Sequence, residues 1–430
     1  MKYFMKKLIA FTLGCIMVVG GVISSFAAEP QLEEKTQSVE NRELWNEIRD
    51  TLDTDEYGGI YVKNGELHIK PKNSEQVESL ILEIAANTRA ASSIVIDEEA
   101  KYTVEELQKA MDNTIDIWDD FQLEHVALSA EYNGLLVGSS EWTEEKKDAF
   151  VEVVGMDHIV FEVTRDENIE QQSDEIERAG KAPKPGTLVE NDAVRNKTDN
   201  APLLSTISAC VVGDFDGYVT TAHGQGVKKD QPNKEAIVEE GNLIYSDYRM
   251  GEVLGHIEKK VMEGSRGVDA VLIKKDDGAE MSNVFPLDKG TLVTEEVAFE
   301  GDRVNIFGGQ EVIEGAIVRS THCTKQWDDQ LDDEGSDMWY NMIMMTTLKG
   351  TPRGGNSGGT VAVCVDSDLK YYGIVGVYKG HSLDSCDRSF YTDDMIDEEA
   401  VSAAERAATV YLYASNWGNV KRALGIDSIY

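Results

Sequence analysis

The chain has 430 residues, which is enough for two domains that each bury a core. It carries 79 acidic and 41 basic residues, for a net charge of −38. This balance argues against nucleic-acid binding, which needs a basic surface, so no nucleic-acid partner is expected.

The first 28 residues have the pattern of an export signal. Three lysines precede an apolar stretch over residues 8–26, and the small residues at its end match a cleavage site before Ala28. Removal of those lysines, with no acids lost, leaves 38 basic and 79 acidic residues, a net charge of −41. We predict a secreted protein with no membrane association after cleavage. An uncleaved anchor helix and a lipoprotein site at Cys15 are the alternatives.

Residues 29–165 alternate short strands with amphipathic helices, which predicts a small α+β domain. Asn64-Gly65 and Asn133-Gly134 each lie between alternating apolar runs and predict two hairpins. A capping-box pattern, Thr103 with Glu106, predicts the start of a helix. Further helices are predicted over 75–86 and 143–153, and single strands over 93–96 and 158–163.

Residues 166–202 differ in kind from what precedes them. They are rich in charged and amide side chains, include Pro183 and Pro185, and lack a sustained apolar period. This composition predicts an exposed linker or activation segment that is open to proteolysis.

Residues 203–430 are dominated by short apolar runs separated by glycine turns. At least ten strands with almost no helix predict a mostly β domain, an antiparallel barrel or sandwich. One helix is predicted over 415–424, with Ser415 as its cap and Gly425 as its end.

Three residues that carry chemistry occur within this β region. His223 follows an apolar strand that ends Thr-Thr-Ala, and Asp269 opens a strand that continues Ala-Val-Leu-Ile. Ser357 lies in the glycine cluster of residues 354–359. In acyl transfer a serine oxygen attacks, a histidine takes its proton, and a carboxylate orients the imidazole. We therefore predict Ser357 as nucleophile, His223 as general base and then acid, and Asp269 as the orienting residue of a serine endopeptidase.

The glycines around Ser357 suit an oxyanion hole. An exposed nucleophile with backbone amides behind it needs a tight turn, which glycine permits. The amides of Gly355 and Ser357 are the predicted donors. A glycine-rich turn by itself is more often a structural loop, and a lone histidine is more often a core residue. The combination of all three segments is what favours catalysis.

Four cysteines remain after removal of the signal: Cys210, Cys323, Cys364 and Cys386. An oxidising destination permits disulfide bonds, and four cysteines allow three connectivities that the sequence does not distinguish. Their spacing is not that of a metal site, and no cofactor or metal is predicted.

The three segments resemble those of the chymotrypsin-like serine endopeptidases, especially the secreted bacterial streptogrisin and α-lytic type. The similarity covers residues 203–424 and includes the strand Gly373 to Tyr378 after the serine. It implies two six-stranded barrels with the triad between them. It also implies that Gly376, Val377 and Tyr378 border the substrate cleft. Residues 29–165 would then be a pro-region that assists folding and blocks the cleft.

Two residues depart from the family pattern. Gly224 follows the histidine, where the family often has a bridged cysteine, and Asn356 precedes the serine, where trypsin-like zymogens have aspartate. A neutral amide cannot form the charge pair with a new N-terminal ammonium that orders those zymogens. Removal of an inhibitory pro-region is therefore the expected route of activation.

We expect a monomeric proenzyme whose partners are its own pro-region and protein or peptide substrates. Two alternatives remain open at this point. The first is a catalytically silent relative that serves as a binding or adhesion module. The second is a narrow processing protease that keeps residues 29–165 as a regulatory domain.

Overall fold

The computed structural model describes residues 42, 44–49, 51–72, 75–87, 94–164, 183–191, 204–225, 239–245, 252–309, 311–327, 336–347, 356–385 and 409–430. The predicted export signal, most of segment 166–202, the predicted oxyanion donor Gly355 and Cys386 lie outside these residues.

In the described part of the N-terminal region, helical residues 42 and 44–49 come first, and a small sheet with a further helix follows. The strands of this sheet are β1 (Tyr57–Lys63), β2 (Glu66–Pro71) and β3 (Ile94–Ile96), and the further helix is α2 (Glu75–Asn87). Asn64 and Gly65 join β1 to β2 with φ of 52° and 81°, the left-handed values that an Asn-Gly hairpin turn needs. The first predicted hairpin is thus confirmed.

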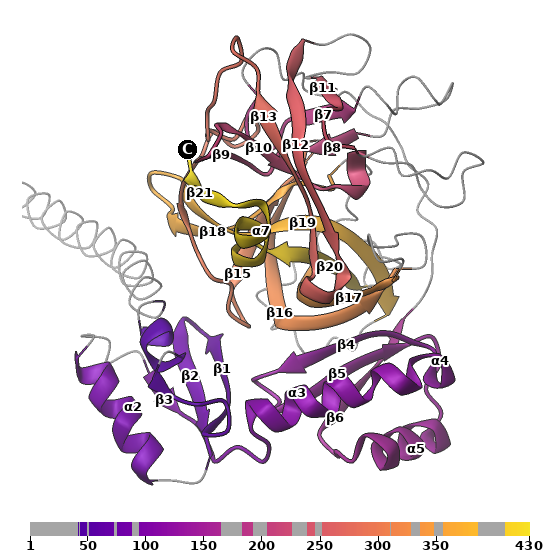
Figure 1. Cartoon of the computed structure of the whole chain (residues 1–430). Coiled ribbons are helices and arrows are strands. Elements are labelled where there is room, and N and C mark those ends of the chain that lie inside the picture. The colour runs from indigo at the N-terminus through magenta and orange to yellow at the C-terminus, as the bar shows by residue number, and fades with distance from the viewer. Residues whose placement is uncertain are drawn as a thin grey trace, which may run out of the picture.

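A second α+β unit follows directly. It contains α3 (Val104–Asn113), η1 (Ile115–Ile117), α4 (Trp118–Phe121), β4 (Leu123–Ser129), β5 (Gly134–Ser139), α5 (Glu144–Val154) and β6 (Ile159–Thr164). The capping box at Thr103 forms as predicted. The helices of this unit lie on the side of β4, β5 and β6 away from the β lobes (Figure 1), where Phe150 is fully buried.

The first β lobe is a single eight-stranded sheet in the order β21-β9-β10-β13-β12-β11-β7-β8. Its strands are β7 (Leu188–Asn191), β8 (Leu204–Thr206), β9 (Ala209–Gly213), β10 (Gly217–Thr220), β11 (Leu243–Tyr245), β12 (Val253–Glu263), β13 (Val268–Lys275) and β21 (Ile426–Ile429). Strand β7 comes from the segment predicted to be an exposed linker. That expectation is wrong for residues 188–191, because Leu188 and Val189 are buried in the sheet.

The second lobe is a closed six-stranded barrel. Its order is β15-β18-β19-β20-β17-β16, and a further β15–β16 pairing closes the ring. The strands are β15 (Arg303–Phe307), β16 (Val312–Gln326), β17 (Met338–Thr347), β18 (Thr360–Asp366), β19 (Tyr371–Ser385) and β20 (Thr409–Asn416). Strand β14 (Thr291–Glu295) pairs with β19 from outside this ring. The predicted mostly β class is confirmed, although only this lobe matches the expected six-stranded barrel.

The last helix, α7 (Trp417–Leu424), packs against β13 and β19. Its N-cap is Asn416, whose side chain accepts a hydrogen bond from the Gly418 amide. The predicted cap, Ser415, instead belongs to β20 and points its hydroxyl at the Asp269 amide. Gly425 ends the helix in the left-handed conformation, as predicted.

The N-terminal region and the barrel share one continuous sheet. Strand β4 pairs antiparallel with the far end of β16, so that Ala127 lies opposite Cys323. Strand β6 pairs with the far end of β19, where Thr164 lies opposite Asp384. The long barrel strands therefore continue into the N-terminal sheet, which Figure 1 shows beneath the barrel.

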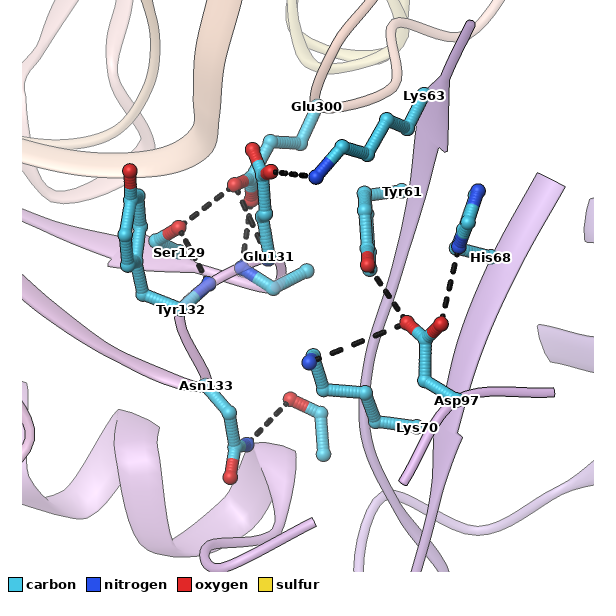
Figure 2. Close-up of polar contacts among 12 residues, drawn as sticks. Tyr61, Lys63, His68, Lys70, Asp97, Ser129, Glu131, Tyr132, Asn133 and Glu300 are labelled. Atoms are coloured by element: carbon cyan, nitrogen blue, oxygen red, sulfur yellow. Dashed lines mark hydrogen bonds and ion pairs between the residues drawn. The ribbon is translucent and has the colours of Figure 1, made fainter. Parts of the chain in front are cut away.

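A buried carboxylate makes a second junction between the two parts. Glu300, in the loop before β15, accepts hydrogen bonds from the Ser129 hydroxyl (2.7 Å) and from the amides of Ala130 (2.6 Å) and Glu131 (3.2 Å). Figure 2 shows this carboxylate inside the turn between β4 and β5. The neighbouring amide of Val62 donates to the Glu300 carbonyl, so the same loop also holds β1.

Three cysteines, Cys210, Cys323 and Cys364, lie within the described ranges, and no disulfide joins any two of them. Cys210 and Cys323 are buried, and Cys364 is exposed. The expected disulfide bonding is thus not seen among these three, and a bridge to Cys386 lies outside the described residues. Burial raises the pKa of Cys210 to about 12, which keeps this thiol protonated.

None of the helices within the described ranges is both long enough and apolar enough to cross a membrane.

Candidate active site

The pairing of β10 with β13 brings the histidine and the aspartate together. Thr220 lies opposite Val271, and continuation of this antiparallel register places Ala222 opposite Asp269. The short helix η2 (His223–Gln225) begins one residue later. The amides of Ala222 and His223 donate to Asp269 Oδ1 at 2.9 and 3.0 Å. The end of one strand is thus bonded to a carboxylate on the next.

The imidazole completes this contact. His223 Nδ1 lies 2.5 Å from Asp269 Oδ2, and the histidine side chain keeps 14% of its surface exposed while the aspartate has none. A carboxylate bonded to Nδ1 fixes the ring orientation and leaves Nε2 as the nitrogen that can accept a proton. The predicted pair of His223 and Asp269 is therefore formed.

The Asp269 carboxylate has a second charged partner that the sequence analysis missed. Lys379 Nζ lies 2.5 Å from Oδ2, and both side chains are fully buried. Burial alone would raise the pKa of Asp269, but the charges of Lys379 and His223 and their hydrogen bonds outweigh it and hold that pKa well below its ordinary value. The carboxylate therefore stays ionised.

Ser357 lies in a tight turn before β18. The Thr206 amide donates to its carbonyl oxygen (2.7 Å), and the following Gly358 has φ of +90°. A Cβ at Gly358 would lie 2.2 Å from the Thr206 carbonyl oxygen, so only glycine fits here. Thr206 belongs to β8, and the Gln225 side chain of η2 donates to the Ser205 hydroxyl on that same strand. Strand β8 thus contacts both the serine turn and the helix that bears His223.

The serine hydroxyl has its own partner. Ser357 Oγ donates to the Lys379 carbonyl oxygen at 3.1 Å. Among the described residues no hydrogen bond joins Ser357 to His223. The structure therefore brings His223 and Asp269 into direct contact and links Ser357 to them through Lys379.

Asn356, before the serine, is buried and donates from Nδ2 to Glu311 Oε1 at 2.9 Å. An aspartate at this position would face the Glu311 carboxylate. The neutral amide singled out in the sequence therefore has a local structural partner.

The predicted substrate-binding strand differs from expectation. Gly376 and Val377 pair with β18, the backbone of Tyr378 bonds to Gly358 and Gly359 just before that strand, and all three residues pair with β20 on the other side. Both Val377 and Tyr378 are buried. A substrate backbone needs a free strand edge, and this register gives these three residues none. Their role in substrate binding stays a prediction that the pairing does not favour.

No cluster of three or more histidine, cysteine, aspartate or glutamate side chains with the geometry of a metal site occurs within the described ranges.

A scan against protein-family models and a search of curated proteins found no match. Solved structures similar to this chain are serine proteases. One is a glutamic-acid-specific serine protease with a histidine triad in substrate binding, at 15% identity and a TM-score of 0.37, covering 57% of this chain and 100% of that one. Protease A of Thermobifida fusca has 13% identity and a TM-score of 0.37, and the match covers 58% of this chain and 98% of that one. A Nocardiopsis protease has 12% identity and a TM-score of 0.37, and the match covers 58% of this chain and 100% of that one.

Proposed function

We propose that this chain is a serine endopeptidase that is secreted as a proenzyme. The observation that carries the proposal is the buried Asp269 carboxylate, which binds His223 Nδ1 and the two amides beside it. A carboxylate held in this way orients an imidazole for proton transfer, which is the use such a pair has in acyl transfer. Ser357 follows in a turn that glycine alone can form.

The roles of the three residues follow from their chemistry. Ser357 Oγ attacks a peptide carbonyl, and His223 Nε2 takes the hydroxyl proton and then gives it to the leaving amine. Asp269 stabilises the imidazolium that forms between these steps. We propose that the hydroxyl leaves the Lys379 carbonyl and bonds to the imidazole when substrate binds, because catalytic hydrogen bonds often form only with substrate present.

The amides of Ser357 and Gly355 remain the proposed donors to the oxyanion, and no cofactor is required. The apolar segment with its cleavage site supports export. Residues 29–165 are proposed as the pro-region, which is removed at the segment 166–202.

A peptide library tests the proposal directly. We expect hydrolysis by the mature wild-type protein and a loss of at least 10³-fold in kcat/KM for Ser357→Ala, by analogy with removal of any triad nucleophile. Cys364→Ser is a matched control, because this residue is exposed and lies in the second half of β18, beyond the turn that holds Ser357. Equal hydrolysis by wild type and Ser357→Ala would refute the assignment.

A second candidate is a processing protease that retains residues 29–165. The observation in its favour is the shared sheet, in which β4 pairs with β16 and β6 pairs with β19. Removal of the N-terminal region would expose the edges of both barrel strands. The mass of the mature chain separates the candidates, because only a proenzyme loses the residues that precede its catalytic domain.

A further inference from the structure

Lys379 occupies an unusual place for a lysine. Its side chain is fully buried, with Nζ 3.2 Å from the centre of the Trp339 ring and 5.1 Å from that of Trp327. Burial of an ammonium is costly unless the charge is paired and its donors are used. The Asp269 carboxylate supplies the pair at 2.5 Å, and the indole faces supply cation–π contacts.

The backbone of β19 is built to aim this side chain at Asp269. Tyr378 lies opposite Ala414 of β20, and Gly380 lies opposite the very next residue, Tyr413. Lys379 is therefore the extra residue of a β-bulge. A bulge redirects a side chain that a regular strand would point elsewhere.

The lysine and the histidine share one oxygen atom. Lys379 Nζ and His223 Nδ1 both lie 2.5 Å from Asp269 Oδ2, so these two nitrogens are at most 5 Å apart. Oδ1 is occupied by the amides of Ala222 and His223. All the acceptor positions of the carboxylate are thus in use.

We infer that Lys379 is a positioning residue of the proposed active site, which neutralises Asp269 and thereby limits the basicity of the His223 imidazole. The inference rests on the proposed function for its catalytic meaning. Without the lysine, the buried pair carries one negative charge and gains strongly from protonation of the imidazole. With the lysine, the same protonation leaves a net positive charge in a buried site.

The lysine also contacts the other end of the proposed triad. Its carbonyl oxygen accepts the hydrogen bond of the Ser357 hydroxyl, at 3.1 Å. One residue therefore holds the carboxylate through its side chain and the nucleophile through its backbone.

Few other charges face this group. Within the described ranges, the charged partners of Asp269 are His223 from η2 and Lys379 from β19. Two other titratable groups are bonded to the residues that precede Ser357 and Lys379: Glu311 bonds to Asn356, and His381 Nδ1 lies 3.2 Å from the Tyr378 hydroxyl. The change in basicity of the His223 imidazole that is expected on removal of Lys379 is therefore dominated by the charge of the lysine itself.

The test is an NMR titration of the His223 ring nitrogens in the full chain. In Lys379→Met the midpoint should move to higher pH by about one to two pH units, the size expected for a unit charge within ~5 Å at an intermediate dielectric. Lys379→Gln, which can still donate a hydrogen bond but carries no charge, should shift the midpoint in the same direction, and it serves if the methionine variant does not fold.

Lys325→Met is the matched control. Lys325 is also buried, on strand β16 of the same barrel, but it pairs with Glu124 at 2.9 Å. Its removal should leave the midpoint unchanged. A midpoint that is the same in wild type and in both Lys379 variants would overturn the inference. Peptide hydrolysis by the wild type is scored separately, so that absence of activity refutes the proposed function while the titration still decides the role of Lys379.

Discussion

Gly358 illustrates how one backbone angle holds the candidate nucleophile in place. Its φ of +90° turns the chain directly after Ser357, and a side chain here would collide with the Thr206 carbonyl and the Thr220 hydroxyl. Its amide donates to the Tyr378 carbonyl at 2.8 Å. The turn therefore joins the serine to β8, β10 and β19 at once.

Substitution of Gly358 by alanine should destabilise the fold by roughly 3 kcal/mol or more, because backbone strain and a backbone collision add. Gly425→Ala is the control, since Gly425 has a similar φ of +73° with no atom within 4 Å of an added Cβ. That variant should lose only about 1 kcal/mol of unfolding free energy. Guanidinium unfolding of both variants measures the difference, and equal losses would show that the collision is relieved without cost.

Residues whose chemistry shows in local sequence could be predicted, whereas those set by sheet geometry could not. His223 and Asp269 are bonded as their places beside two apolar strands indicated. Lys379 was missed, although a lysine directly after the apolar run of residues 373–378 was a detectable signal. The direction of its side chain depends on a bulge between β19 and β20, which no local sequence pattern reveals.

At the scale of elements, the sequence indicated most of the N-terminal helices and strands but not what they pair with. Strand β4 has the alternation of a hairpin, and nothing in it shows that its other edge pairs with β16, about 200 residues later. The strand at 188–191 was not predicted, because its four buried residues are too few to give an apolar pattern within a charged segment. Pairings at such sequence separation are set by tertiary contacts.

The junction at Glu300 gives a pH-dependent prediction. Burial raises the pKa of Glu300 to about 7, despite three hydrogen bonds and the nearby Arg319, which lower it. The folded protein then holds this proton more tightly than the unfolded chain, so stability falls as the pH rises from about 4.5 to 7. The loss across this window is about 3 kcal/mol.

Glu300→Gln should remove that loss, so that the difference in unfolding free energy between variant and wild type changes with pH over this window. Guanidinium unfolding at a series of pH values measures it. Glu131→Gln is the control, because it removes an exposed carboxylate of the same turn that pairs with Lys63. A Glu300→Gln variant that keeps the wild-type pH dependence would contradict the assignment.

For the molecule as a whole, two β lobes and an N-terminal α+β region are joined by strand pairing and by polar contacts that include the buried Glu300 carboxylate. One core cluster includes residues of both lobes and of the last helix, among them Val219, Ile374 and Trp417. The His223–Asp269 pair comes from the first lobe, whereas Lys379 and the turn of Ser357 belong to the second. The candidate site therefore depends on the packing of one lobe against the other.

The central claim is that Ser357 is a nucleophile activated by His223. Intact-mass spectrometry of the protein after treatment with a fluorophosphonate tests this most directly. We predict one adduct per wild-type molecule, no adduct on Ser357→Ala, and labelling at least 10²-fold slower for His223→Ala. A wild-type protein that gains no adduct, or a Ser357→Ala variant that is labelled as fast as wild type, would contradict the account.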